Sequence, residues 1–128
     1  MNSANTALTA EFSSDHAVTV TGGTTGTDVI NVTASTSAVT FTSKITNVDT
    51  VNVVDFGDGA VGSTTPAGED ITLNLGAYAT ALTINASALD AGTSTTETGE
   101  TLTVDGSTAT GTLNITGGAA SDTITGGS

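Results

Sequence analysis

The chain alternates apolar and polar residues over short stretches, and these stretches recur at a nearly fixed interval. Asp28, Asp49 and Asp70 each precede such a stretch and are evenly spaced, and Asp90 continues the series at almost the same interval. Alternation with a period of two predicts β-strands whose Val, Ile and Leu side chains point inward and whose Thr side chains point outward. A repeat of about 21 residues predicts turns of chain that stack on one another.

A second set of strand-like stretches lies about half an interval from the first. Its members are Val18–Val20, Val39–Phe41, Leu82–Ile84 and Leu102–Val104, and Ile124 continues the series. Two strands per repeat predict an all-β fold, a parallel β-solenoid (β-helix or β-roll) of about five to six rungs with a period of about 21 residues. Short strands every ten to twelve residues also fit an antiparallel β-sandwich, which is the alternative fold.

The repeat divides the chain into two parts. Residues 1–16 are expected to form an entry or capping segment, and residues 17–128 the β-solenoid repeat domain. Within that domain, 57–66 contains the only proline and 91–100 is polar, so each is expected to form a loop. The sequence ends inside a further glycine-rich turn, which predicts that the repeat continues into a longer RTX-like array.

The charge balance excludes several classes of function. The net charge of −12 comes from 13 acidic residues opposed by Lys44 alone, so there is no basic face for nucleic acid. No apolar run is long enough for a transmembrane helix. Without arginine or tryptophan, the chain also lacks the groups that enzymes of β-helical fold use on polysaccharides, so we expect no catalytic activity. Metal cations are the natural partners.

Stacked turns would bring the repeated aspartates close together. Neighbouring strands lie about 4.8 Å apart, and two carboxylates at that distance repel by roughly 1 kcal/mol in water and about 3–4 kcal/mol near a protein surface. Calcium, which takes six to eight oxygen ligands, would convert this repulsion into a cross-link. In the alternative interpretation, each aspartate only accepts hydrogen bonds from its own turn. The candidate calcium ligands are Asp28, Asp49, Asp70, Asp90 and Asp122, with Asp55 and Asp58 in a glycine-containing loop.

Two segments resemble the nonapeptide Gly-Gly-x-Gly-x-Asp-x-apolar-x of the RTX (repeats-in-toxin) family. In the first, Gly117 and Gly118 fill the two leading positions, Asp122 the sixth and Ile124 the eighth, while Ala120 stands where the family has glycine. The second segment, 23–31, keeps the first and fourth glycines, Asp28 and an apolar residue, but lacks the second glycine. The whole chain also resembles calcium-dependent surface-layer proteins and large adhesins in its Thr-, Ala- and Gly-rich composition.

The resemblance implies an extracellular or bacterial cell-surface location, with type I secretion through a C-terminal signal outside this segment. It implies a calcium-stabilised structural module of a surface layer, filament or matrix protein that self-assembles through its solenoid. The alternative is an extender or ligand-binding module of an RTX adhesin, with cell-surface polysaccharide as a partner. Ice binding is a third possibility, because a column of outward threonines is expected at Thr19, Thr40, Thr83, Thr103 and Thr123.

Overall fold

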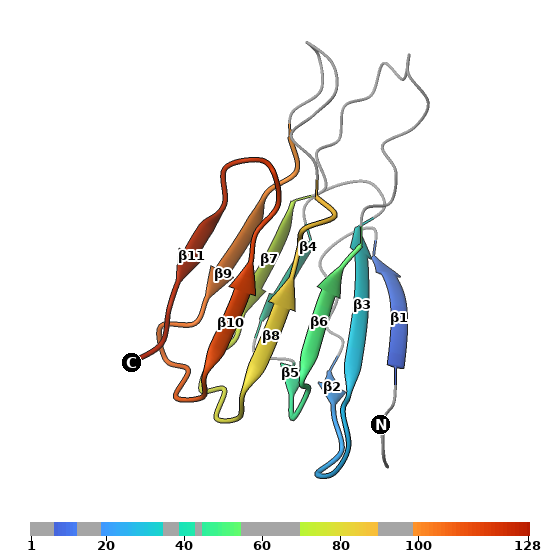
Figure 1. Ribbon diagram of the computed structural model, residues 1–128, viewed down its shortest axis with the longest axis vertical. Helices are drawn as coiled ribbons and strands as arrows, with labels where there is room; N and C mark the ends of the chain where they lie inside the picture. The colour runs from blue at the N-terminus through green and yellow to red at the C-terminus, as the bar shows by residue number, and fades with distance from the viewer. Residues whose placement is uncertain (1–6, 13–18, 35–38, 43–44, 55–69, 90–98) are drawn as a thin grey trace.

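The structure is a computed structural model that describes residues 7–12, 19–34, 39–42, 45–54, 70–89 and 99–128. This part of the chain is all-β and contains no helix (Figure 1). No helix in it could therefore cross a membrane. Its strands are β1 (Ala7–Phe12), β2 (Val20–Thr21), β3 (Val29–Ala34), β4 (Val39–Thr42), β5 (Ile45–Thr46), β6 (Thr50–Val53), β7 (Ile71–Asn74), β8 (Leu82–Asn85), β9 (Leu102–Asp105), β10 (Leu113–Thr116) and β11 (Thr123–Thr125).

The described strands form three sheets in which every pair is parallel. Sheet A has the order β1-β3-β6-β8-β10, sheet C the order β11-β9-β7-β4, and sheet B contains only β2 and β5. The parallel pairing agrees with the predicted class of fold and excludes an antiparallel sandwich for this part of the chain. From β6 to β11, successive strands alternate between sheet A and sheet C.

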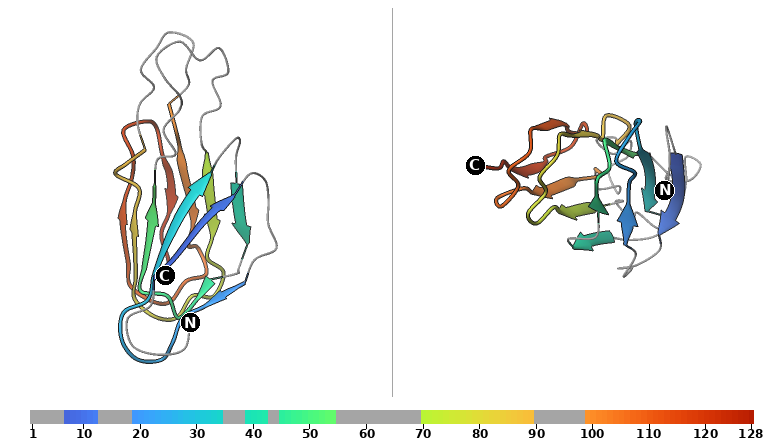
Figure 2. Two further views of the ribbon diagram at one scale, coloured as in Figure 1. Left: turned by 90° about the vertical axis from the view of Figure 1, so that its right-hand side faces the viewer. Right: turned by 90° about the horizontal axis from the view of Figure 1, so that it is seen from below.

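Sheets A and C form two layers that enclose the core (Figure 2). The strands of sheet A run upward in Figure 1 and those of sheet C run downward. Residues that begin strands of sheet A therefore lie at the lower end of the molecule, and residues that begin strands of sheet C lie at the upper end. We use "lower end" and "upper end" in this sense below.

The predicted alternation of inward and outward side chains is confirmed in the central strands. In β8, Leu82 and Ile84 are buried while Thr83 is exposed. Strands β6, β7 and β9 bury alternate residues in the same way. The buried apolar cluster is made of small and medium side chains with one aromatic: Val20, Ile30, Val32, Ile45, Val48, Val51, Val53, Ile71, Leu73, Leu75, Tyr78, Leu82, Ile84, Ala86, Leu89, Leu102, Val104 and Ala109.

The repeat is not constant when it is measured by strand pairing. The aligned pairs in sheet A are Ala7 with Val29, Val29 with Thr50, Thr50 with Thr83, and Leu82 with Leu113. The first two steps are close to the predicted period, but the last two are longer by about half a repeat. These longer steps include 55–69 or 90–98, which lie outside the described residues. In sheet C, the step from β9 to β11 is again close to the predicted length, because Thr103 is aligned with Thr123.

Because the steps lengthen, β7 and β8 lie in the sheets opposite to those predicted, whereas β9 and β11 share sheet C with β4 as predicted. Leu82–Ile84 was expected beside Val39–Phe41, but β8 belongs to sheet A, whereas β4 belongs to sheet C. Ile71 was expected beside Val51, but β7 also belongs to sheet C. The threonine column changes accordingly, because Thr83 lies in the other sheet and Thr40, Thr72, Thr103 and Thr123 are in register across sheet C.

The predicted entry segment contributes a strand. Residues Ala7–Phe12 form β1, which pairs with β3 along its whole length and is the edge strand of sheet A. The first residue of this pairing, Ala7, is aligned with Val29.

Candidate functional site

Asp28 and Asp49 lie side by side at the lower end of sheet A. Val29 is aligned with Thr50, so the two preceding aspartates occupy the same place on neighbouring strands. The backbone N–H of Asp28 donates to Oδ2 of Asp49 at 2.7 Å. The Asp28 carbonyl oxygen accepts the N–H groups of Asp49 and Thr50, both at 3.0 Å. The predicted vertical neighbours are thus directly bonded through side chain and backbone.

The carboxylate of Asp28 is enclosed by protein. Its side chain is only 1 % exposed. Oδ2 accepts the N–H of Gly23 at 2.5 Å, but Oδ1 is buried without a hydrogen-bond partner in the described part of the chain. A buried ionised carboxylate with unsatisfied oxygen costs several kcal/mol. A cation coordinated by Oδ1 would remove this cost.

A glycine allows the carboxylate of Asp28 to lie against the backbone. A Cβ atom on Gly22 would lie 1.6 Å from the carbonyl oxygen of Asn47 and 2.8 Å from Oδ2 of Asp28. The N–H of Gly22 donates to the Thr46 carbonyl at 2.7 Å, which holds the two segments together. Position 22 therefore requires glycine because there is no space for a side chain.

A shallow depression of about 250 Å³ is lined by Asp49 and by residues that precede Asp28 in the turn before β3. Gly26 and Asn47 in its wall have φ values of 90° and 51°, the left-handed region that turns carbonyl groups away from regular strand geometry. Carboxylate, amide, hydroxyl and carbonyl oxygens are the ligands that calcium prefers. The residues that line the depression are Gly23, Thr24, Gly26, Asn47, Asp49 and Thr80.

Asp70 and Asp122 lie at the opposite, upper end, where they flank the start of β9. Oδ1 of Asp70 accepts the N–H of Thr101 at 3.2 Å and the Thr101 hydroxyl at 2.5 Å. Oδ1 of Asp122 accepts the N–H of Leu102 at 2.9 Å. Each carboxylate therefore satisfies a backbone donor of a neighbouring turn of chain, and not a donor of its own turn as the alternative interpretation predicts.

The predicted column of aspartates is thus divided between two ends of the molecule. Asp28 and Asp49 are brought together, whereas Asp70 and Asp122 are separated from them and lie on either side of β9. Asp90, Asp55 and Asp58 fall outside the described residues. Among the residues that are described, no group of three or more His, Cys, Asp or Glu side chains is gathered closely enough to hold a metal ion. A cation site built from the described residues alone would combine at most two carboxylates with neutral oxygens.

Sequence reasoning missed two buried polar residues. Glu100, expected in a polar loop, is 2 % exposed directly before Thr101. Tyr78 is 4 % exposed, and burial raises its pKa above the ordinary value of 10.0. The charge of Asp49 raises the pKa of Tyr78 further, while hydrogen bonds with Thr80 and Val48 act in the opposite direction. The available signal for Tyr78 was that it is the only tyrosine in a chain with few aromatic residues.

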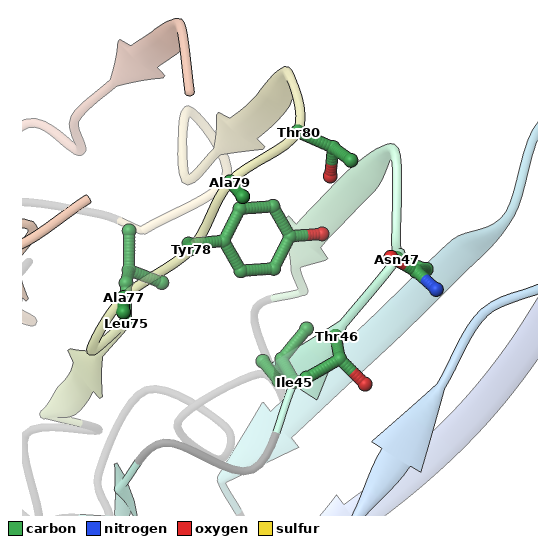
Figure 3. A pocket seen from close by; sticks show the side chains of 8 residues that line it. All are labelled: Ile45, Thr46, Asn47, Leu75, Ala77, Tyr78, Ala79 and Thr80. Atoms are coloured by element: carbon green, nitrogen blue, oxygen red, sulfur yellow. The ribbon is translucent and has the colours of Figure 1, made fainter. Parts of the chain in front are cut away.

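A second depression, of about 210 Å³, lies next to Tyr78 (Figure 3). It shares Asn47 and Thr80 with the depression beside Asp49, so the two are contiguous. Its remaining lining is mostly apolar and comes from Ile45, Thr46, Leu75, Ala77, Tyr78 and Ala79.

Comparison with known proteins identified no relative of this chain. No family model matches the chain, and neither a curated protein nor a solved structure shows significant similarity to it.

Proposed function

We propose that this chain is a calcium-stabilised structural module of an extracellular surface layer, filament or matrix protein. The observation that carries the proposal is the buried carboxylate of Asp28, whose Oδ1 has no partner within the described chain, in a residue whose backbone N–H donates to Asp49. The chain has few positive charges to neutralise this pair, since its net charge is −12, and its Lys44 and His16 both lie outside the described residues. A divalent cation supplies the missing charge.

The proposed fold in finer detail is a parallel β-solenoid of about five to six rungs. Two features support it: all described pairs are parallel, and successive strands from β6 to β11 alternate between sheets A and C. The rung is then one repeat long over the first two steps of sheet A, and about one and a half repeats long where 55–69 and 90–98 are included.

Calcium fits the lower end better than magnesium does. Two carboxylates and neutral oxygens in an irregular arrangement suit the variable coordination of Ca²⁺ at about 2.3–2.6 Å, whereas Mg²⁺ requires a nearly ideal octahedron. Asp28 and Asp49 would hold the ion, with neutral oxygens from the lining of the adjacent depression. The ion would link β3 to β6 and so stabilise the stacking of two turns of chain. Asp70 and Asp122 already accept hydrogen bonds at the start of β9, so the proposed ion is placed at Asp28 and Asp49. Asp90, Asp55 and Asp58 lie outside the described residues.

Thermal unfolding in calcium and in EGTA tests the proposal. We expect a higher melting temperature in calcium, because an ion that binds only the folded state at 100 times its Kd adds about 2.7 kcal/mol. The double variant Asp28→Ala/Asp49→Ala should lose this gain. Asp105→Asn is the matched control, since it removes one exposed carboxylate but keeps an acceptor for the Ser107 N–H. Equal melting temperatures of the wild type in calcium and EGTA would contradict the proposal.

The outer face of sheet A supports a second candidate, a polysaccharide-binding or extender module of a secreted adhesin. Asn31, Asn52 and Asn85 are in register on this face, and Nδ2 of Asn52 donates to Oδ1 of Asn31 at 2.9 Å. Thr50 and Thr83 form a neighbouring aligned pair. Uncharged amides and hydroxyls are suitable partners for sugar hydroxyl groups. Binding to purified cell-surface polysaccharide that Asn52→Ala weakens would favour this candidate.

Ice binding is less well supported. In sheet C the threonine column is accompanied by a second column that contains Asn74, Asp105 and Thr125 in register. The charge of exposed Asp105 interrupts an otherwise uncharged array. An ice-recrystallisation assay decides this candidate directly.

A further inference from the structure

Tyr78 is bonded to the backbone of the residue between Asn47 and Asp49. Its hydroxyl donates to the carbonyl oxygen of Val48 and accepts the N–H of the same residue, the latter at 2.7 Å. Figure 3 shows the Tyr78 ring crossing from its own segment toward the segment that carries Asn47. Val48 itself is fully buried. A single phenol therefore satisfies both backbone polar groups of Val48.

Tyr78 is also bonded to the following turn of chain. Its carbonyl oxygen accepts the N–H groups of Thr110 and Gly111 at 2.9 and 3.1 Å, directly before β10. Its own N–H donates to the carbonyl of Gly76 at 2.9 Å, where the φ of 59° at Gly76 turns the chain. One residue thus connects the segment before β6, the segment before β8 and the segment before β10.

This contact holds the residue directly before Asp49. Asp49 follows Val48 directly, and Asn47 before it has a left-handed backbone, so the segment is not held by regular strand geometry on that side. Oδ2 of Asp49 must stay within hydrogen-bond reach of the Asp28 N–H for the two residues to remain bonded. Small displacements of a ligand weaken coordination because the ligand must be held close to its productive geometry.

We propose that Tyr78 is the positioning residue of the Asp28–Asp49 calcium site: its hydroxyl fixes Val48 and thereby Asp49, so that ion binding there is transmitted to the turns that begin β8 and β10. The inference rests on the proposed function, since it concerns the same site. It adds a residue that contributes no ligand and comes from a different turn of chain.

The variant Tyr78→Phe tests the inference, because it keeps the ring and removes only the hydroxyl. We expect calcium affinity measured by isothermal titration calorimetry to fall about tenfold, equivalent to one hydrogen bond of about 1.4 kcal/mol. Ile84→Val is the control, because it removes one methylene from the fully buried core without touching Val48. Ile84→Val should lower the melting temperature and leave the Kd for calcium unchanged.

Hydrogen exchange provides a readout that does not require calcium. In EGTA, the amide of Val48 should exchange faster in Tyr78→Phe than in the wild type, while amides in the centre of β9 should exchange at similar rates. Faster exchange together with weaker calcium binding supports the inference. An unchanged Kd in a variant whose wild type binds calcium overturns the role of Tyr78 and leaves the proposed function intact. A wild type that does not bind calcium overturns both.

The wild-type protein offers a measurement that remains available if Tyr78→Phe fails to fold. Tyr78 is the only tyrosine and the chain has no tryptophan, so tyrosine emission reports this one residue. Calcium should change the emission with the same midpoint that calorimetry gives, and Asp49→Asn should abolish the change. Emission that stays constant while calorimetry detects binding overturns the inference.

Discussion

The lower end of sheet A and the upper end of sheet C both place aspartates directly before strands, yet these aspartates are in different environments. At the lower end, Asp28 is 1 % exposed, and one of its oxygens has no partner within the described chain. At the upper end, Asp70 and Asp122 are partly exposed, and each accepts a hydrogen bond from the start of β9. The same residue type at the same place in a strand therefore has an unpartnered buried oxygen at one end and accepts backbone hydrogen bonds at the other.

The difference shows which quantity determines where a cation is needed. A partly exposed carboxylate that accepts a backbone N–H is stabilised by that bond and by water. A buried carboxylate with an unpartnered oxygen lacks this stabilisation, so its burial lowers the free energy of unfolding. Spacing along the chain does not distinguish the two ends, whereas burial and hydrogen-bond satisfaction do. For this reason the proposed calcium site is placed at the lower end.

The largest expected effect comes from adding a methyl group at the glycine of each end. A Cβ on Gly22 would meet the backbone oxygen of Asn47 at 1.6 Å, whereas a Cβ on Gly117 would meet the side-chain Oδ2 of Asp122 at 2.0 Å. Backbone cannot move as easily as the end of a side chain. Gly22→Ala should therefore cost about 3 kcal/mol and Gly117→Ala about 1 kcal/mol in urea unfolding.

Gly126→Ala is the matched control for these two variants. No atom lies within 4 Å of the place where its Cβ would be, so stability should hardly change. A loss at Gly117 equal to that at Gly22 would mean that the upper end is as tightly packed against its carboxylate as the lower end, and the contrast between the ends would be lost.

Removing one charge at each end gives the next largest effect. In EGTA, the expected change in stability differs in sign between the two ends. In EGTA, Asp28→Asn removes a buried charge without a full set of partners, so stability should rise or stay constant. In calcium, the same variant should lose about 2 kcal/mol of the gain that the ion provides. Asp122→Asn weakens a charged hydrogen bond to Leu102, so it should lose about 1 kcal/mol in both conditions.

Thermal melts of both variants in calcium and in EGTA check this prediction. The informative quantity is the difference between the two conditions for each variant, because it separates ion binding from packing. If Asp122→Asn lost the calcium gain and Asp28→Asn kept it, the proposed site would belong at the upper end.

The sequence predicted the class of fold because alternation and spacing reflect local geometry. It correctly grouped β9 and β11 with β4, but it placed β2, β7 and β8 in the wrong sheets. The start of a strand in sheet C and the start of the next strand in sheet A are separated by the same half repeat in three cases, β4 to β6, β7 to β8, and β9 to β10. Segments such as 55–69 add about half a repeat, so the regular spacing from Asp49 to Asp70 continues while the chain moves to the other sheet. Such an insertion leaves the spacing of the aspartates unchanged, but it changes which sheet the next strand joins.

The candidate site could likewise be predicted only in part from the sequence. Asp28 and Asp49 were correctly expected to be neighbours, because the chain between β3 and β6 has the undisturbed length of one repeat. The burial of Asp28 could not be predicted, since it depends on Gly22 and Asn47 coming together from two turns. The contact of Tyr78 with Val48 joins distant parts of the chain and has no periodic signal.

Asn47 at the lower end provides a smaller and more selective test. A non-glycine residue with a φ of 51° stores about 1 kcal/mol of strain, which Asn tolerates better than Ala. Asn47→Gly should therefore keep or slightly raise stability in EGTA, whereas Asn47→Ala should lower it by about 1 kcal/mol. Both variants remove the amide from the depression beside Asp49, so both should weaken calcium binding if that amide is a ligand. Urea unfolding and calorimetry separate the two effects, and unchanged calcium affinity would exclude the Asn47 side chain from the site.

The smallest effect at neutral pH concerns the buried phenol, which again distinguishes the two ends. Burial, with the charge of Asp49 acting in the same direction, holds the pKa of Tyr78 above 10.0, so folding favours the protonated form. The corresponding stability is complete below pH 10 and is lost as the pH rises toward the pKa of the folded state. Urea unfolding between about pH 8 and pH 11 should therefore show a decline in the wild type and in Asp122→Asn that is much weaker in Tyr78→Phe. The same decline in all three proteins would mean that alkaline loss of stability does not originate at the lower end.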